Sequence, residues 1–63
     1  MYSVIIEKND VTQVKSFSTI TDARALFAWN VYLGTSQAIG VTEVSLLNKK
    51  DKRINHWLRE DLR

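Results

Sequence analysis

Residues 18–34 have the sequence STITDARALFAWNVYLG, and this stretch decides the fold. It begins with Thr19–Asp22, a four-residue segment of the S/T-x-x-D/E type that starts helices, and its acidic residue lies where the helix dipole favours negative charge. Thr21 is an alternative N-cap. Nothing further along breaks a helix until Gly34, which we expect as the C′ residue after the last turn. We therefore predict a helix over Ile20–Leu33.

This helix has two different faces when its residues are projected at about 100° each. One arc is apolar and is expected to pack on a sheet: Ile20, Ala23, Leu26, Phe27, Val31 and Leu33, with Asn30 inside it. The opposite arc holds Thr21, Asp22, Arg24, Ala25, Ala28, Trp29 and Tyr32. A solvated helix face normally carries Lys, Glu and Gln along its length, whereas the charges here are confined to the first turn.

The segment before the helix has the pattern of a β-hairpin. We predict strands over Tyr2–Lys8 and Val11–Phe17, joined by Asn9-Asp10, because Asn and Asp both tolerate a positive φ. A two-residue loop pairs Tyr2 with Phe17, Val4 with Lys15, and Ile6 with Gln13. The expected core side then carries Tyr2, Val4, Ile6 and Phe17, and the other side has Ile5 opposite Val14.

A loop over Thr35–Ala38 and a third strand over Ile39–Leu47 are expected after the helix. Gly40 indicates either a bulge or a late start of this strand. Alternation places Val44 and Leu46 on one face, and Val41, Glu43, Ser45 and Leu47 on the other.

The last part of the chain fits two structures. Asn48–Lys52 resembles a hairpin tip, which makes Arg53–Arg59 a fourth strand. A helix capped by Asp51 is the alternative, because apolar residues also recur at helical spacing: Ile54, Trp57, Leu58 and Leu62. Since a fourth strand completes the sheet, we predict one α+β domain over residues 1–63, with the order ββαββ and ββαβα as the alternative.

Length and composition exclude several classes of protein. A chain of 63 residues forms one small domain, and without Cys it has neither disulfides nor Cys-based zinc sites. With a single His and no Cys, we expect no structural metal site. Neither a run of about 20 apolar residues nor a signal-peptide pattern is present, so a cytoplasmic protein is expected. The net charge is only +2, with most basic residues in 48–63.

Catalytic patterns are not found, so we expect no enzyme, no cofactor and no small-molecule substrate. His56 has no recognisable partner in the sequence and is expected at the surface. Glu60 and Asp61 are adjacent, so they point apart on a strand or a helix alike. Gly34 and Gly40 fit no phosphate-binding loop.

The sharpest candidate for function is the pair Trp29 and Tyr32. Their spacing of three residues makes an aromatic ridge, and Ala25 and Ala28 beside it let another backbone approach. The ridge is expected to bind a protein partner or a second copy of this chain. Alternatively, the C-terminal segment with Trp57 and Leu62 folds back over it.

The basic segment 49–63 is a second candidate, for nucleic acid. Its residues are Lys49, Lys50, Lys52, Arg53, Trp57 and Arg59, where the basic groups reach phosphates and Trp57 offers a stacking surface. The competing interpretation is a solvated turn whose lysines keep sheet edges from pairing with other chains.

The chain also resembles the small accessory proteins encoded by bacteriophages. The resemblance lies in the short frame, the start Met-Tyr-Ser-Val-Ile-Ile, and the helix opening from Ser18 to Arg24. It implies binding to one host protein, such as a polymerase or a defence nuclease, and a role as a regulator or inhibitor.

Overall fold

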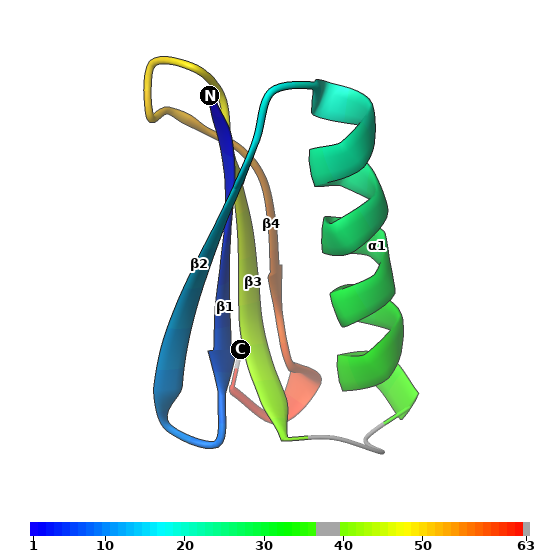
Figure 1. Ribbon diagram of the computed structural model, residues 1–63. Coiled ribbons are helices and arrows are strands. Elements are labelled where there is room, and N and C mark those ends of the chain that lie inside the picture. Colours follow the sequence, from blue (N-terminus) through cyan, green and yellow to red (C-terminus); the bar gives the residue numbers. More distant parts are fainter. Residues whose placement is uncertain (37–39, 63) are drawn as a thin grey trace.

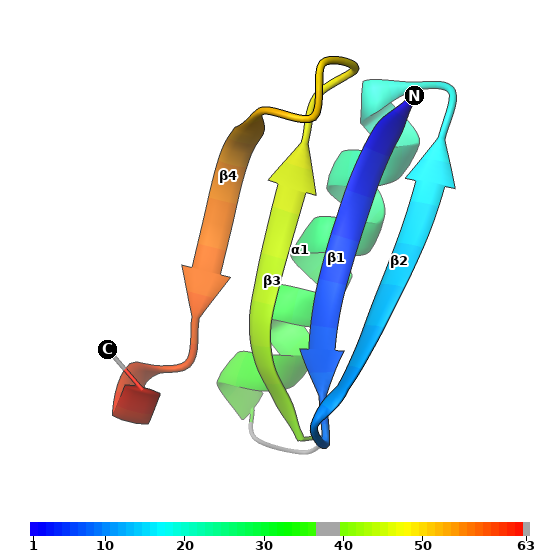
Figure 2. The same cartoon turned by 90° about the vertical axis from the view of Figure 1, so that its left-hand side faces the viewer.

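The computed structural model describes residues 1–36 and 40–62. Its elements are β1 (Tyr2–Lys8), β2 (Val11–Phe17), α1 (Ile20–Ser36), β3 (Val41–Leu47), β4 (Arg53–Leu58) and a short 3-10 turn (Glu60–Leu62). The strands form one antiparallel sheet in the order β2-β1-β3-β4, and α1 packs along one face of it (Figure 1). The view onto the sheet shows its other face without a covering helix (Figure 2). The predicted α+β fold and ββαββ order are confirmed.

The first hairpin has the predicted register. Tyr2 lies opposite Phe17 and Val4 opposite Lys15, and the pairing continues without interruption to Lys8 opposite Val11. Asn9 and Asp10 have φ values of 52° and 65°, as a type I′ turn requires. The short loop thus sets which side chains of β1 face the helix.

The start of α1 is as predicted, with Thr19 as the N-cap rather than Thr21. The backbone N–H of Asp22 donates to Thr19 Oγ1 (3.3 Å), and this hydroxyl donates to Asp22 Oδ2 (3.0 Å). The predicted end at Leu33 is wrong, because the helix continues through a buried Gly34 to Ser36. Gly34 is not in a left-handed conformation but packs against Trp57. Thr35 and Ser36, predicted in the loop, are therefore helical, and residues 37–38 lie outside the described residues.

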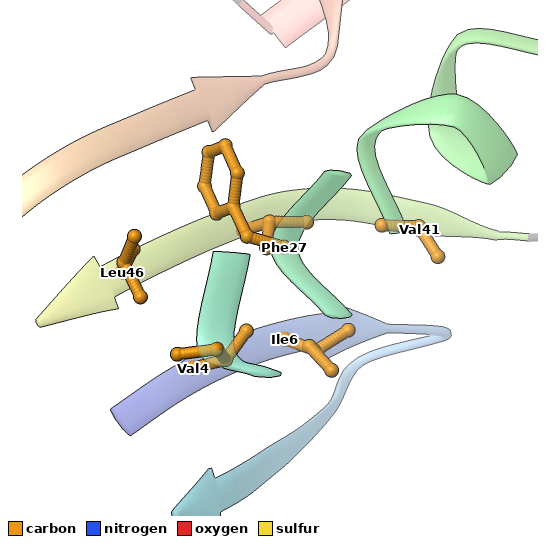
Figure 3. Packing of buried hydrophobic residues seen from close by; sticks show 7 residues of the cluster. Val4, Ile6, Phe27, Val41 and Leu46 are labelled. Carbon is orange, nitrogen blue, oxygen red and sulfur yellow. The ribbon is translucent and has the colours of Figure 1, made fainter. Parts of the chain in front are cut away.

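The core lies between α1 and the two central strands (Figure 3). Its buried apolar residues are Val4, Ile6, Ala23, Phe27, Val41, Val44 and Leu46. The predicted helix arc is confirmed by the burial of Ala23 and Phe27. Asn30, also in this arc, is buried and donates from Nδ2 to the carbonyl of Leu26 (2.9 Å).

Val41 corrects one prediction, because it is fully buried rather than on the face of Glu43. The pairing of β1 with β3 passes from Glu7↔Glu43 to Lys8↔Val41, which leaves Thr42 as an extra residue. This irregularity turns Val41 toward the core. The strand begins at Val41, so the late start indicated by Gly40 is confirmed; Ile39 lies outside the described residues.

Residues 53–58 form a strand, so the helical alternative for this segment is wrong. Trp57 lies opposite Val44 and Leu58 opposite Glu43, which places them on different faces of the sheet. The predicted tip at Asn48–Lys52 is confirmed, since Asn48 Oδ1 accepts from the N–H groups of Lys50 (2.8 Å) and Lys52 (3.0 Å). The strand ends at Leu58, one residue before the predicted end.

Within the described ranges, no helix is long and apolar enough to cross a membrane.

Candidate functional site

The outer face of α1 carries the two most prominent exposed aromatic side chains. Trp29 is 56% and Tyr32 62% exposed. Their rings stack on each other, with centroids 5.7 Å apart and planes inclined by 25°. The structure therefore brings this predicted pair together as one ridge. Ala25 and Ala28, the predicted small neighbours, are also exposed on this helix.

The surface around the ridge is electrically neutral along the helix. Residues 25–36 contain no Asp, Glu, Lys or Arg, and the charged helix residues Asp22 and Arg24 lie in the first turn and a half. We name the exposed surface formed by Ala25, Ala28, Trp29 and Tyr32 the aromatic face of α1.

Residues 53–62, the described part of the C-terminal segment, do not cover the aromatic face. Trp57, the residue expected to do so, packs on the sheet side of α1, against Gly34 and the core. Leu62 is 49% exposed. The alternative in which the C-terminal segment folds back over the ridge is therefore wrong, because β4 directs Trp57 into the core.

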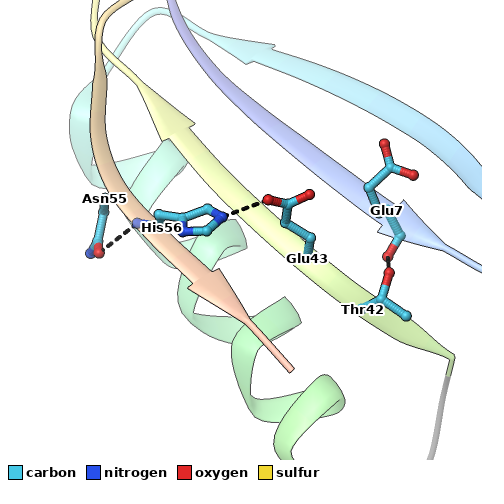
Figure 4. A network of polar contacts seen from close by, with 5 residues as sticks. All are labelled: Glu7, Thr42, Glu43, Asn55 and His56. Atoms are coloured by element: carbon cyan, nitrogen blue, oxygen red, sulfur yellow. Dashed lines mark hydrogen bonds and ion pairs between the residues drawn. The ribbon is translucent and has the colours of Figure 1, made fainter. Parts of the chain in front are cut away.

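The open face of the sheet carries a polar cluster that the sequence did not reveal (Figure 4). His56 Nε2 lies 2.6 Å from Glu43 Oε2, and both side chains are about a third exposed. Glu7 lies opposite Glu43 on the next strand and accepts a hydrogen bond from the Thr12 hydroxyl. These residues meet through the strand register, so only a correct pairing of β1, β3 and β4 could have found the cluster.

In residues 1–36 and 40–62, no three His, Cys, Asp or Glu side chains are arranged to hold a metal ion. The same part of the chain encloses no pocket. His56 Nε2 contacts the carboxylate of Glu43.

The basic segment is divided between two ends of β4. Lys50 and Lys52 are exposed at the β3–β4 tip, where Lys49 Nζ lies 5.6 Å from the centroid of the Tyr2 ring. At the other end, Trp57 is half-buried against the core, away from a position where a base could stack on both its faces. The structure thus does not join these residues, or Arg53 near the tip, into one phosphate-and-stacking surface.

Arg59, the last member of that segment, is held by Asp61. Its Nε and Nη2 donate to the two carboxylate oxygens of Asp61, at 2.6 and 2.9 Å. This hydrogen bonding lowers the pKa of Asp61 and raises that of Arg59. The guanidinium is therefore already paired with an anion.

Comparisons with protein-family models, with curated proteins and with solved structures give no match for this chain.

Proposed function

We propose that this protein is a non-catalytic binding module that regulates or inhibits a host protein through the aromatic face of α1. The stacked and exposed pair of Trp29 and Tyr32 carries the proposal. Trp and Tyr are the residues most often found to dominate the free energy of protein association. The core forms from other residues, so folding does not account for this large apolar surface.

The composition of the face favours a protein partner over a nucleic acid. Its aromatic rings and small alanines allow close packing of another backbone, and the absence of charge from residues 25–36 leaves nothing to bind phosphate. Association through it should depend weakly on salt. The sequence resemblance to bacteriophage accessory proteins makes a bacterial polymerase or a defence nuclease the first partner to test.

The experiment compares the wild-type chain with the Trp29→Ala/Tyr32→Ala variant. A protein captured from a bacterial extract by the wild type is purified, and its affinity for both chains is measured. Removal of a dominant aromatic residue costs about 2 kcal/mol of association energy, so affinity should fall by at least about 30-fold. Ile54→Ala is the matched control, because Ile54 is an exposed apolar residue on β4.

Unchanged affinity of the double variant for the captured protein would refute the proposal. The nucleic-acid alternative is tested separately with labelled DNA and RNA oligonucleotides at about 50 and about 200 mM salt. Binding through the basic segment would weaken steeply between these concentrations.

A further inference from the structure

The two outer strands of the sheet differ in how well they are protected. β2 and β4 are the edges, and an edge strand presents unpaired N–H and C=O groups to other chains (Figure 2). Folded proteins usually protect such edges with bulges, charged residues, or side chains that occupy the free backbone groups.

β4 has three of these protections. Its pairing with β3 is irregular next to Leu47, where the partner shifts from Asn55 to Arg53. Arg53 adds a charge at the start of the strand. The N–H of His56 donates to Asn55 Oδ1 (2.9 Å), so a side chain already occupies this backbone donor (Figure 4).

Of these three protections, the described structure of β2 has only a charged residue. All seven of its residues pair regularly with β1, and Lys15 is its single charged residue. Val11 and Val14 are 57% and 60% exposed on it. A regular, nearly uncharged edge strand with exposed valines is the kind that pairs with another strand.

The hairpin register shows which backbone groups of β2 face outward. In a two-residue hairpin the residues that flank the loop, here Lys8 and Val11, exchange backbone hydrogen bonds. Every second residue after Val11 then also bonds to β1. The alternate residues Thr12, Val14 and Ser16 direct their N–H and C=O groups away from the sheet.

We propose that a second copy of this chain pairs with β2 through these groups, antiparallel and centred on Val14. In this register Val14 faces Val14 of the other copy, and Thr12 faces Ser16, so all three outward residues both donate and accept. A shift in either direction leaves some of them unpaired. The two sheets thereby join into one continuous antiparallel sheet.

The side chains of β2 are self-complementary in the same register. Val11 lies opposite Phe17 of the other copy, an aromatic and β-branched pair of the kind that stabilises sheets. Gln13 lies opposite Lys15, so the two lysines are not directly opposed. On the open face, Ile5 and Val14 of one chain lie in line with Val14 and Ile5 of the other, which covers part of both copies of Val14.

The symmetry of this pairing places both helices on the same side of the joined sheet, since its two-fold axis is perpendicular to the sheet. Both aromatic faces then remain free. The edge pairing is thus independent of the proposed function, and either proposal can be refuted while the other holds.

The test uses sedimentation velocity of the wild type and of Val14→Lys and Val14→Glu, up to about 1 mM, the range of weak association. The wild type should show a concentration-dependent doubling of mass. Each charged variant should remain monomeric, because identical charges face each other at the two-fold axis. An equimolar mixture of both variants should regain the doubled mass, because Lys then faces Glu. Circular dichroism checks that each variant is folded.

Three results would overturn the proposal: a wild type that stays monomeric, a dimer that survives Val14→Lys, or a mixture that does not reassociate. Loss of the dimer in Trp29→Ala instead would place the contact on the aromatic face. A measurement without substitution is NMR of mixed labelled and unlabelled chains. The register predicts an intermolecular contact between the Hα atoms of Gln13 and Lys15, and its absence in a dimer excludes this register.

Discussion

Gly34 of α1 lies directly against the indole ring of Trp57 from β4. A methyl group on Gly34 would be 2.6 Å from Trp57 Cζ3, closer than carbon atoms can pack, and 3.3 Å from Cζ2, a tight contact. Glycine inside a helix costs about 1 kcal/mol relative to alanine. Here the missing side chain of Gly34 leaves room for the indole ring of the last strand, which packs at the end of the core beside Val44.

Gly34→Ala should therefore destabilise the protein, although this substitution usually stabilises a helix by about 0.5–1 kcal/mol. Overpacking against the ring should cost about 1–3 kcal/mol in urea unfolding. Thr35→Ala, at the exposed next position, is the control and should change stability little.

The cause of that loss is checked with Trp57→Leu in a double-mutant cycle. If the added methyl collides with the ring, the double variant should lose less stability than the sum of the single variants. A more stable Gly34→Ala protein would contradict the close contact.

The same pair shows where prediction from sequence ends. The start of the helix and the register of the first hairpin depend on neighbouring residues, Thr19 with Asp22 and Asn9 with Asp10, so local patterns predict them. The end of the helix depends on Trp57, which is distant in the sequence. A glycine that accommodates a ring has the same local pattern as one that ends a helix.

Val41 and the aromatic face follow the same distinction. Val41 is buried because Thr42 is extra in the pairing with β1, and no alternation within β3 reveals a partner's register. Trp29 and Tyr32 could be placed opposite the core arc from helical spacing alone. Their exposure could not be predicted, because it required β4 to be a strand that turns Trp57 inward.

Truncation of Phe27 should lower the free energy of unfolding far more than truncation of Trp29, because the two residues lie on opposite sides of α1. Phe27 is buried in the core and Trp29 is 56% exposed. Phe27→Ala should cost about 3–5 kcal/mol, comparable with the entire stability of so small a domain. Trp29→Ala should change the free energy of unfolding by about 0.5 kcal/mol or less. Urea unfolding monitored by circular dichroism measures both, and equal losses would contradict the assigned faces.

Asp10→Gly should stabilise the first hairpin. Asp10 has a φ of 65°, a conformation that strains residues with a Cβ, and Asn-Gly is the preferred type I′ turn. We expect a gain of about 0.5 kcal/mol in thermal unfolding. Asp22→Gly, the same substitution in the first turn of α1, is the control and should lose about 1 kcal/mol. A loss at both positions would argue against the left-handed turn.

Glu7→Gln should also stabilise the protein, through relief of repulsion on the open face of the sheet. Glu7 lies opposite Glu43 on the neighbouring strand, and like charges in this arrangement are destabilising. Glutamine still offers an oxygen to the Thr12 hydroxyl, so the local hydrogen bond is retained. The expected gain is about 0.5 kcal/mol at pH 7 and low salt.

Glu43→Gln is the informative comparison, because it removes the same repulsion but also the carboxylate that lies 2.6 Å from His56 Nε2. Its gain should therefore be smaller than that of Glu7→Gln, or absent. About 1 M salt should bring the two variants closer to the wild type, because it screens exposed charges beyond about 3 Å. Urea unfolding midpoints of the three proteins at both salt concentrations measure the effect. Equal gains in the two variants would show that the contact of Glu43 with His56 adds no stability, and a loss in Glu7→Gln would show that the opposed carboxylates do not repel.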